Sequence, residues 1–312
     1  MPNTFDPTKD IGDLNGKTIL VTGGNAGIGE ATVRALAMHK PACLYLCARN
    51  TTTAHTVVES IRETNPEAKI EILQLDLSSF DSIKECAAEF NAKSDRLDIL
   101  VLNAGVGVTA PKLTNEGYES QFGINHLGHS LLTQLILPKM LETHRREPGA
   151  DVRITVTSSM GANRFAPSSG LALGDMHDAN AFKSSMTRYG HSKLANILFA
   201  RKLAQLYPSI TTTSTHPGLV KSAIWGRMDG PAWQSWLFAP LVYLTGVTTA
   251  EGAKTQLWAA TANGVETGKY YEPIGKATYG SENANSQELT DELWEWTRKE
   301  VAKHGGPGWP PA

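Results

Sequence analysis

The chain has 312 residues, of which 41% are hydrophobic and 19% are charged, the balance of a globular protein with ample apolar material for a core. The formal net charge of −2 gives no electrostatic basis for binding nucleic acid or an anionic membrane. Cys43, Cys47 and Cys86 form neither a CxxC pair nor a disulfide framework, so we expect three free thiols in a reducing compartment.

Apolar runs rich in β-branched residues alternate with helical patterns along the chain. The predicted strands, in order, are 17–23, 42–48, 69–75, 97–102, 152–157, 210–215 and 269–272. The predicted helices are 30–39, 53–64, 79–91, 121–141, 189–207 and 249–260. Strands that are apolar throughout and separated by helices indicate a parallel sheet covered on both faces. With right-handed crossovers, this predicts one α/β domain over 1–312, a doubly wound Rossmann fold with a seven-stranded parallel sheet flanked by helices.

The first predicted strand runs directly into a glycine-rich turn that opens a helix. The turn reads TGxxxGxG, with glycines at 23, 27 and 29. Glycine permits the tight turn and lets the backbone approach a pyrophosphate at the helix N-terminus. The strand–turn–helix context is what makes such a pattern specific. We therefore predict a dinucleotide site, in which Asn25 and Ile28 of the same turn also take part.

The end of the second strand predicts which dinucleotide is bound. Folds that use NAD place a carboxylate there to bond the ribose 2′-OH, but this chain has Arg49 and no acidic residue. A guanidinium can pair with a 2′-phosphate, which favours NADP(H). Alternatively, Arg49 is a solvated loop cation and the enzyme does not distinguish the two cofactors. Asp76 and Leu77 follow the third strand, where Asp76 can accept from the adenine amino group or instead cap the next helix.

Tyr189 and Lys193 are spaced i, i+4 and so share one face of a predicted helix. A free tyrosine, with a pKa near 10, is a poor acid–base catalyst at neutral pH. A neighbouring cation favours the phenolate, and we expect Lys193 to lower the pKa of Tyr189. Tyr189 would then protonate the alkoxide formed during carbonyl reduction, or deprotonate an alcohol during oxidation.

In combination, the motifs resemble the short-chain dehydrogenase/reductase family over about residues 17–222. They occur in the family's order: TGxxxGxG, Asp76-Leu77, Asn103-Ala104-Gly105, Asn125, Ser158-Ser159, Tyr189-x-x-x-Lys193 and His216-Pro217-Gly218. Further segments resemble the retinol-dehydrogenase-like branch and its fungal members: the segments that begin at Asn125 (NHLGH), Tyr189 (YGHSKLAN), Gly268 (GKYYEP) and Leu293 (LWEW).

This resemblance implies roles for several further residues. Ser159, the second of two serines after the fifth strand, would hold the substrate carbonyl oxygen as a hydrogen-bond donor, with Ser158 as its rival. Asn125 would organise a water relay to Lys193, which also bonds the nicotinamide ribose; the alternative is that Asn125 satisfies local backbone. The remaining residues are expected to contact the cofactor: Asn103, Ala104, Gly105, Pro217, Gly218, Val220 and Ser222.

Two segments are expected to form the substrate side. Residues 163–188 should border the mouth of the active site. Residues 219–247 are rich in aromatic side chains, which suggests an apolar lid over a lipophilic substrate. Ordinary packing, a dimer contact or a membrane-surface helix remain alternatives for this lid segment. The Gly- and Pro-rich residues 305–312 are predicted to be a loose tail.

His126 and His129 are close enough on one helix to suggest a metal site, but no third ligand follows and we predict none. The N-terminal residues are polar and lack a secretory signal, and no stretch approaches the roughly 20 apolar residues of a transmembrane helix. We therefore expect a cytoplasmic protein without a transmembrane segment, either a monomer or a homodimer.

The expected function is NADPH-dependent reduction of a ketone or aldehyde on a lipophilic small molecule. Reduction is the favoured direction because cells normally keep this cofactor reduced, and the proton would come from Tyr189. A non-redox biosynthetic catalyst, such as an isomerase or dehydratase, is one alternative. A non-catalytic NADP-binding regulatory protein on the same fold is another, because a fold alone does not determine function.

Overall fold

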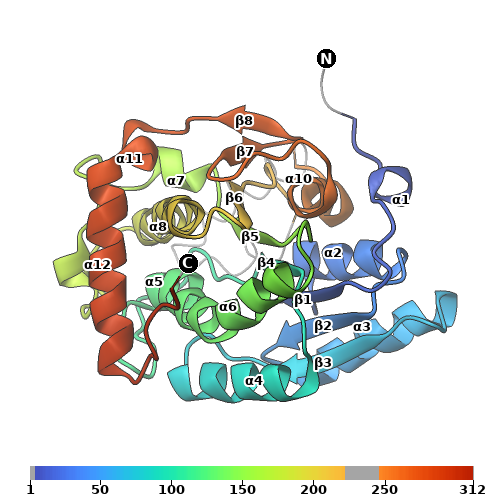
Figure 1. Ribbon diagram of the computed structural model, residues 1–312. Coiled ribbons are helices and arrows are strands. Elements are labelled where there is room, and N and C mark those ends of the chain that lie inside the picture. The colour runs from blue at the N-terminus through green and yellow to red at the C-terminus, as the bar shows by residue number, and fades with distance from the viewer. Residues whose placement is uncertain (1–3, 222–245, 312) are drawn as a thin grey trace.

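The computed structural model describes residues 4–221 and 246–311, which form an α/β structure around one eight-stranded sheet (Figure 1). Its strands are β1 (Thr18–Thr22), β2 (Cys43–Ala48), β3 (Ile70–Gln74), β4 (Ile99–Leu102), β5 (Arg153–Thr157), β6 (Thr211–Thr215), β7 (Tyr270–Glu272) and β8 (Lys276–Thr278). Their order is β3-β2-β1-β4-β5-β6-β7-β8, and all neighbours pair in parallel except β7 and β8. The predicted doubly wound Rossmann fold is confirmed.

The prediction of a purely parallel, seven-stranded sheet was wrong by one strand. β8 pairs antiparallel with β7, with Glu272 opposite Lys276 and a three-residue turn between them. Gly275 in this turn has φ +66, the left-handed conformation that short hairpin loops require. β8 is a short edge strand of exposed or half-buried residues, so it lacks the apolar pattern by which the other strands were found.

The helices cover both faces of the sheet. They are α1 (Pro7–Asp10), α2 (Gly27–Ala37), α3 (Thr51–Thr64), α4 (Phe80–Lys93), α5 (Ser120–Phe122), the π-helix η1 (Gly123–Leu127), α6 (Gly128–Arg146), α7 (Gly161–Arg164), the 3₁₀ helix η2 (Leu173–Asp175), α8 (Ser185–Leu206), α10 (Thr249–Thr261), α11 (Glu282–Asn285) and α12 (Gln287–Lys303). One core cluster joins α2, α3 and α10 to the sheet, and the other joins α4, α6, α8 and α12 (Figure 1). Because β1 to β7 pair in parallel, their carboxyl ends lie along one edge of the sheet, between the two helix layers.

Side-chain caps fix where several helices begin. Asn50 accepts a hydrogen bond from Thr53 N–H at the start of α3, and Ser79 accepts from Ser82 N–H at the start of α4. The predicted helix 121–141 has a feature that its sequence did not predict. After the short α5, the helix becomes π-helical over η1, and α6 then continues to Arg146. π-helical turns often occur at functional sites, and this one contains Asn125.

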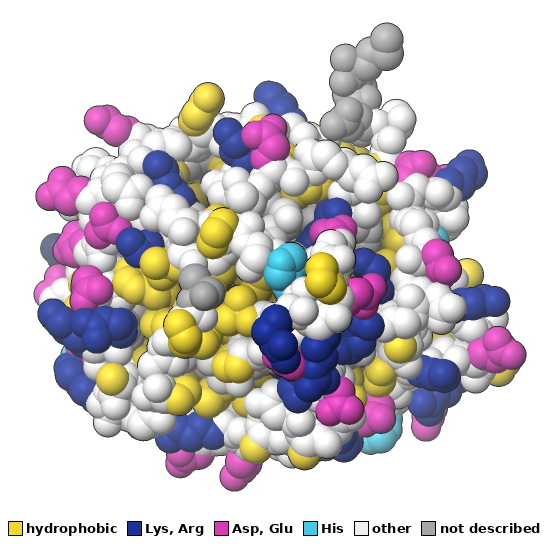
Figure 2. Space-filling view, viewed as in Figure 1, with side chains coloured by type: hydrophobic (Ala, Val, Ile, Leu, Met, Phe, Trp, Pro, Cys, Tyr) yellow, Lys and Arg dark blue, Asp and Glu magenta, His cyan; other side chains and the backbone are white. Residues whose placement is uncertain are grey.

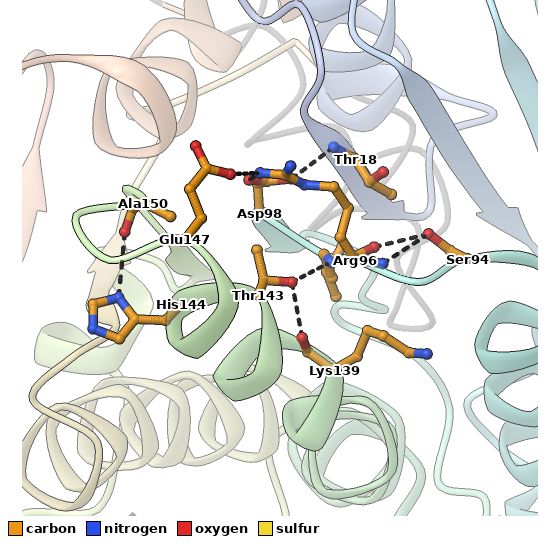
Figure 3. Close-up of polar contacts among 10 residues, drawn as sticks. Thr18, Ser94, Arg96, Asp98, Lys139, Thr143, His144, Glu147 and Ala150 are labelled. Atoms are coloured by element: carbon orange, nitrogen blue, oxygen red, sulfur yellow. Dashed lines mark hydrogen bonds and ion pairs between the residues drawn. The ribbon is translucent and has the colours of Figure 1, made fainter.

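The amino edge of the sheet carries a network of charged side chains. Arg96 donates to Asp98 and Glu147, and Asp98 also accepts from Thr18 N–H at the start of β1 (Figure 3). Lys and Arg side chains gather at this end of the molecule with carboxylates between them (Figure 2). A hollow of about 630 Å³ lies among the starts of β1, β2 and β3.

The last residues of the chain pack against the fold, so the expectation of a loose tail was wrong. Trp309 lies 4.4 Å from Trp294 and 5.9 Å from Phe199, measured between ring centroids. Tyr207 donates a hydrogen bond to the Pro310 carbonyl. The Gly and Pro content indicated flexibility, but an aromatic side chain between them supplies enough apolar contact to hold the segment.

The predicted lid segment, 219–247, falls largely outside the described residues, which resume at Gly246. At its two ends, Val220 and Val247 form an isolated parallel bridge. Within the described part of the chain, no helix combines the length and apolar character needed to cross a bilayer.

Candidate active site

The glycine-rich turn lies at the carboxyl end of β1, where β1 is flanked by β2 and β4. The N–H groups of Gly23 and Gly24 both donate to the Cys47 carbonyl, so the turn is fixed to the end of β2. Gly23 and Gly27 have φ +67 and +59, which favours glycine. A Cβ at Gly29 would lie 2.1 Å from the Gly23 carbonyl oxygen, so only glycine fits there. Ile28, in the first turn of α2, is half-buried and packs against the core.

The segment after β4 lies directly against this turn. Thr22 Oγ1 accepts from the N–H groups of Asn103 and Ala104, both at 3.0 Å. The Asn103 amide also donates to the Thr22 carbonyl. The Cα of Ala104 is 3.0 Å from the point that a Cβ on Gly23 would occupy, so the two loops are in close contact. Crevices of this kind, between strands whose connections leave in opposite directions, bind nucleotides in doubly wound folds.

Arg49 lies at the end of β2, immediately before the capped start of α3. Its side chain is exposed, and no carboxylate among the described residues pairs with it. Asn25 of the glycine-rich turn donates to Thr53 Oγ1 at 2.6 Å, which holds the turn next to the first turn of α3. A guanidinium, hydroxyl groups and a helix N-terminus therefore lie together beside the dinucleotide turn, a combination suited to a phosphate.

Asp76 begins the loop after β3, and its carboxylate is partly engaged by that loop. Asp76 Oδ1 accepts from both the N–H and the hydroxyl of Ser78, at 2.9 and 2.6 Å. The alternative in which Asp76 caps α4 was wrong, because Ser79 does so. Leu77 is buried, and its carbonyl oxygen lies 2.6 Å from where a Cβ on Gly128 would stand.

Ser159 and Tyr189 meet above the carboxyl end of β5. The point where a Cβ on Gly161 would stand is 3.1 Å from the Tyr189 ring and 3.3 Å from Ser159 Oγ, and the Ser159 hydroxyl acts to lower the pKa of Tyr189. Ser159 Oγ also accepts from Gly161 N–H at 3.0 Å, which leaves the hydroxyl proton free to be donated. Ser158, its rival, is buried and donates instead to the Lys193 carbonyl. Of the two serines, Ser159 is the one whose hydroxyl influences the phenol.

Lys193 is buried one helical turn along α8 from Tyr189. Its Nζ donates to the Thr157 carbonyl at 3.0 Å and lies 5.8 Å from the centre of the Tyr189 ring. Burial lowers the pKa of Lys193 to about 8, which leaves it mostly protonated at pH 7. The expected lowering of the tyrosine pKa is not what the structure gives. Burial raises the pKa of Tyr189, and the nearby Ser159 hydroxyl opposes the rise.

Asn125 is fully buried in η1, and its side-chain amide is held on both sides. Its Oδ1 accepts from Val106 N–H at 2.8 Å, and its Nδ2 donates to the Val106 carbonyl and to Ser192 Oγ, both at 2.9 Å. Ser192 Oγ in turn donates to the Tyr189 carbonyl. Gly105 lies between this amide and Lys193: a Cβ there would stand 3.0 Å from Asn125 Oδ1 and 3.4 Å from Lys193 Nζ.

The residues after β6 reach the same edge of the sheet. His216 Nδ1 accepts from Gly218 N–H, and Gly218 has φ +84. Pro217 lies between these two residues, and Val220 is buried against α10. Ser222, which the sequence placed at the cofactor, lies outside the described residues.

Two residues at this edge were not found from the sequence. Gln256 of α10 donates to Asn103 Oδ1 and Thr32 Oγ1 and accepts from Thr157 Oγ1, so it ties the segments around the crevice together. Gly161 is close to Tyr189: a Cβ there would stand 3.1 Å from the Tyr189 ring. Gln256 belongs to no local motif, but Gly161 could have been found from its position two residues after Ser159.

The two neighbouring histidines point to different parts of the fold. His126 Nε2 bonds Thr297 of α12, whereas His129 Nε2 bonds Thr22 of β1. In the described ranges, no group of three or more His, Cys, Asp or Glu side chains is arranged to hold a metal ion.

The residues present fit a nicotinamide dinucleotide. At Gly27 of the turn no atom lies within 4 Å of where a Cβ would stand, and Gly105 leaves a space between Asn125 and Lys193 that a side chain would fill. Such space lets a ligand approach hydrogen-bonding groups closely.

Comparisons with known proteins agree with this arrangement. A model of the short chain dehydrogenase family matches residues 17–170. A short-chain dehydrogenase/reductase of Colletotrichum higginsianum is 37% identical over 96% of this chain and 78% of its own length. Human retinol dehydrogenase 12 is 35% identical over 90% of this chain and 85% of its own. The chain belongs to the short-chain dehydrogenase/reductase family and is retinol-dehydrogenase-like within it.

Solved structures show the same fold at lower identity. NADPH-bound carbonyl reductase from chicken fatty liver matches with a TM-score of 0.65 and 22% identity, over 87% of this chain and 97% of that one. An uncharacterized protein from Mycobacterium paratuberculosis matches with a TM-score of 0.73 and 23% identity, over 95% and 97% of the two chains. The protein is therefore an oxidoreductase of a family whose members use NAD(H) or NADP(H).

Proposed function

We propose that the protein is an NADPH-dependent reductase that interconverts a carbonyl and an alcohol on a lipophilic small molecule, with Tyr189 as general acid–base. The observation that carries this proposal is the convergence of the Ser159 hydroxyl and the Tyr189 ring beside Gly161, with the buried ammonium of Lys193 one turn away. The retinol dehydrogenase and carbonyl reductase among its relatives and fold neighbours support the same class of reaction.

The protonation states of these groups suit reduction. Because burial raises the pKa of Tyr189, its phenol carries a proton at neutral pH and can give it to a developing alkoxide. Ser159, whose oxygen accepts from Gly161 N–H, can direct its own hydroxyl toward the carbonyl oxygen of the substrate. A bound nicotinamide supplies or accepts the hydride. The positive charge of Lys193 then favours the phenolate that proton transfer leaves behind.

Asn125 completes the proposed catalytic set with Ser159, Tyr189 and Lys193. Its amide is locked between the Val106 backbone and Ser192, so it can hold a fixed geometry beside Lys193. We propose that Asn125 supports a water relay to Lys193, which would return a proton to Tyr189 after each turnover.

The remaining predicted residues would hold the cofactor. The turn containing Gly23, Asn25, Gly27, Ile28 and Gly29 would take the pyrophosphate. Asp76 and Leu77 would contact the adenine, and the residues at 103–105, 217, 218, 220 and 222 would line the nicotinamide half. Arg49 beside the start of α3 supports a 2′-phosphate contact, and hence NADP(H).

The first test is Tyr189→Phe. Purified protein with NADPH and a panel of aryl ketones, aldehydes and quinones should consume NADPH. Tyr189→Phe should lower kcat by about 10²- to 10⁴-fold, because the proton donor is lost, while the Kd for NADPH changes little. Tyr207→Phe, which removes a phenol just beyond the far end of α8, is the matched control and should keep full turnover. Undiminished turnover in Tyr189→Phe would contradict the catalytic assignment.

The second test is Arg49→Ala. This variant should weaken NADPH binding about 10- to 100-fold, as expected for loss of a charge-assisted contact, and should leave NADH binding nearly unchanged. Fluorescence titration of the two reduced cofactors measures both constants. Arg62→Ala is the control. Arg62 lies in the last turn of α3, the helix that follows Arg49, so this variant removes an equal charge far from the glycine-rich turn. Equal losses for NADPH and NADH would rule out the 2′-phosphate contact.

A further inference from the structure

One buried side chain, His129 of α6, connects the dinucleotide turn to the proposed catalytic set. Its Nε2 lies 2.9 Å from Thr22 Oγ1 at the end of β1, and its Nδ1 lies 3.0 Å from the Asn125 carbonyl oxygen. The ring is 1% exposed, so neither bond competes with solvent. His129 ends the NHLGH segment that begins at Asn125, but the sequence predicted no role for it in cofactor binding or catalysis.

The hydrogen-bond partners permit one consistent set of proton positions. The Asn125 carbonyl can only accept, so His129 Nδ1 carries the hydrogen and donates it. Nε2 is then the acceptor and takes the hydroxyl proton of Thr22 at 2.9 Å, whereas the other acceptor in reach of this hydroxyl, the Val101 carbonyl, is 3.5 Å away. The lone pairs of Thr22 Oγ1 are left for the N–H groups of Asn103 and Ala104, which donate to it at 3.0 Å. Burial lowers the pKa of His129 to about 4, so the ring stays neutral in the physiological range.

The same chain of bonds continues to the catalytic helix. The Asn125 amide donates to Ser192 Oγ, and Ser192 donates to the Tyr189 carbonyl. Val106 and Ser192 bond both ends of the Asn125 side-chain amide. His129 bonds the backbone carbonyl of Asn125 and so fixes the orientation of that peptide group. That carbonyl belongs to the π-helical turn η1, where the regular helical bonding pattern is interrupted.

We infer that His129 is a positioning residue. Its neutral ring fixes the Asn125 carbonyl of the π-turn relative to Thr22, and Thr22 in turn holds the loop after β4 that packs against the dinucleotide turn. This inference rests on the proposed function, because it assumes that Asn125 serves turnover and that the turn binds NADPH. The two ring nitrogens have separate tasks. Nδ1 serves the catalytic side through Asn125, and Nε2 serves the cofactor side through Thr22.

Two amide variants separate these tasks. In His129→Asn, the amide nitrogen can occupy the place of Nδ1 and donate to the Asn125 carbonyl, but nothing reaches Thr22. In His129→Gln, the amide oxygen can occupy the place of Nε2 and accept from Thr22, but the donor to Asn125 is lost. His129→Phe fills the volume and removes both bonds. Circular dichroism and thermal unfolding of each variant establish that it is folded before kinetics are measured.

The expected result is a crossed pattern. His129→Phe should lower kcat about tenfold and weaken NADPH binding by a similar factor, because each side loses a buried hydrogen-bond partner. His129→Asn should recover kcat while NADPH binding stays weak, and His129→Gln should do the reverse. Thr22→Val should also keep kcat, but it should weaken NADPH binding more than His129→Asn does, because it removes the acceptor of the Asn103 and Ala104 N–H groups as well. Equal losses in the two amide variants, or wild-type values in His129→Phe, would overturn the inference.

A second measurement does not depend on turnover. Long-range ¹H–¹⁵N spectra of the wild-type protein should show His129 as the neutral Nδ1–H tautomer at pH 6. A protonated ring or the Nε2–H tautomer would overturn the inference. If the wild type reduces no carbonyl in the panel, the proposed reaction fails. The tautomer and the order of the NADPH dissociation constants still decide the role of His129.

Discussion

The two edges of the sheet hold buried or partly buried cations in opposite ways. At the amino edge, Arg96 makes two bonds to Asp98, at 2.6 and 2.9 Å, and Asp98 is 1% exposed (Figure 3). Arg153 at the start of β5 is likewise buried and pairs with Asp151. At the carboxyl edge, Lys193 is buried with the Thr157 carbonyl as its bonded partner, and no carboxylate in the described ranges pairs with it.

This difference separates residues that stabilise the fold from residues available for chemistry. A buried carboxylate neutralises a cation and makes it costly to remove either partner. A buried ammonium held only by a neutral carbonyl keeps its charge free to act on a neighbouring group, here Tyr189. Its lowered pKa records the free-energy cost of that arrangement. Removing the charged group at the amino edge should therefore lower the free energy of unfolding, whereas removing the one at the carboxyl edge should raise it.

Asp98→Ala should have the largest effect on stability. It removes the partner of Arg96 and leaves Thr18 N–H without its acceptor, so we expect a loss of about 3–5 kcal/mol in the free energy of unfolding. Denaturant unfolding measures it. Asp98→Asn keeps an acceptor oxygen and should lose less. Because the site lies at the opposite edge, kcat per folded molecule should not change. A loss below about 1 kcal/mol would show that the pair contributes little.

Lys193→Met should have the opposite effect on stability. Burial lowers the pKa of Lys193 from 10.5 to about 8, which corresponds to about 3 kcal/mol against folding when the group is charged. Losing the bond to Thr157 offsets about 1 kcal/mol, so the variant should be more stable by about 2 kcal/mol at pH 7. Turnover should nevertheless fall by at least about 100-fold, because the charge beside Tyr189 is gone.

The pH dependence of the free energy of unfolding tests whether Lys193 causes the difference between the wild type and Lys193→Met. Between pH 8 and 10.5 the unfolded chain keeps the Lys193 proton that the folded chain has lost, so stability from this group rises with pH. Below pH 8 its contribution is constant. The wild type should therefore gain about 2 kcal/mol more than Lys193→Met between pH 7.5 and 9.5 in urea unfolding. Parallel pH profiles would show that Lys193 is not the group that titrates.

The sequence predicted the carboxyl edge better than the amino edge. Strand periodicity placed seven strands, and local motifs placed the glycine-rich turn, Ser159, Tyr189 and Lys193 at one end of them. Motifs report such residues because they lie close together in the chain or directly follow a strand. The contacts of Arg96 with Glu147, 51 positions away, leave no local pattern.

Some features of the site itself were also beyond the sequence. The direction of the Tyr189 pKa shift depends on burial, which the i, i+4 spacing does not report. The bond from Thr22 to His129 joins residues 107 positions apart, and Gln256 reaches Thr32 over 224 positions. Such contacts depend on the position and orientation in which each helix packs against the sheet. Sequence periodicity predicts that a helix packs against the sheet, but it does not predict which residues then meet.

Glu147→Gln should have the smallest effect and marks the limit of the amino-edge network. Glu147 bonds Arg96 at 3.0 Å, but its side chain is 61% exposed, so water and salt screen the pair. We expect a loss below about 1 kcal/mol at low salt, vanishing near 1 M salt, whereas the loss in Asp98→Ala should persist there because Asp98 is buried. Unfolding of both variants at the two salt concentrations measures this. A salt-insensitive loss in Glu147→Gln would mean that the outer carboxylate stabilises the edge as firmly as the buried one.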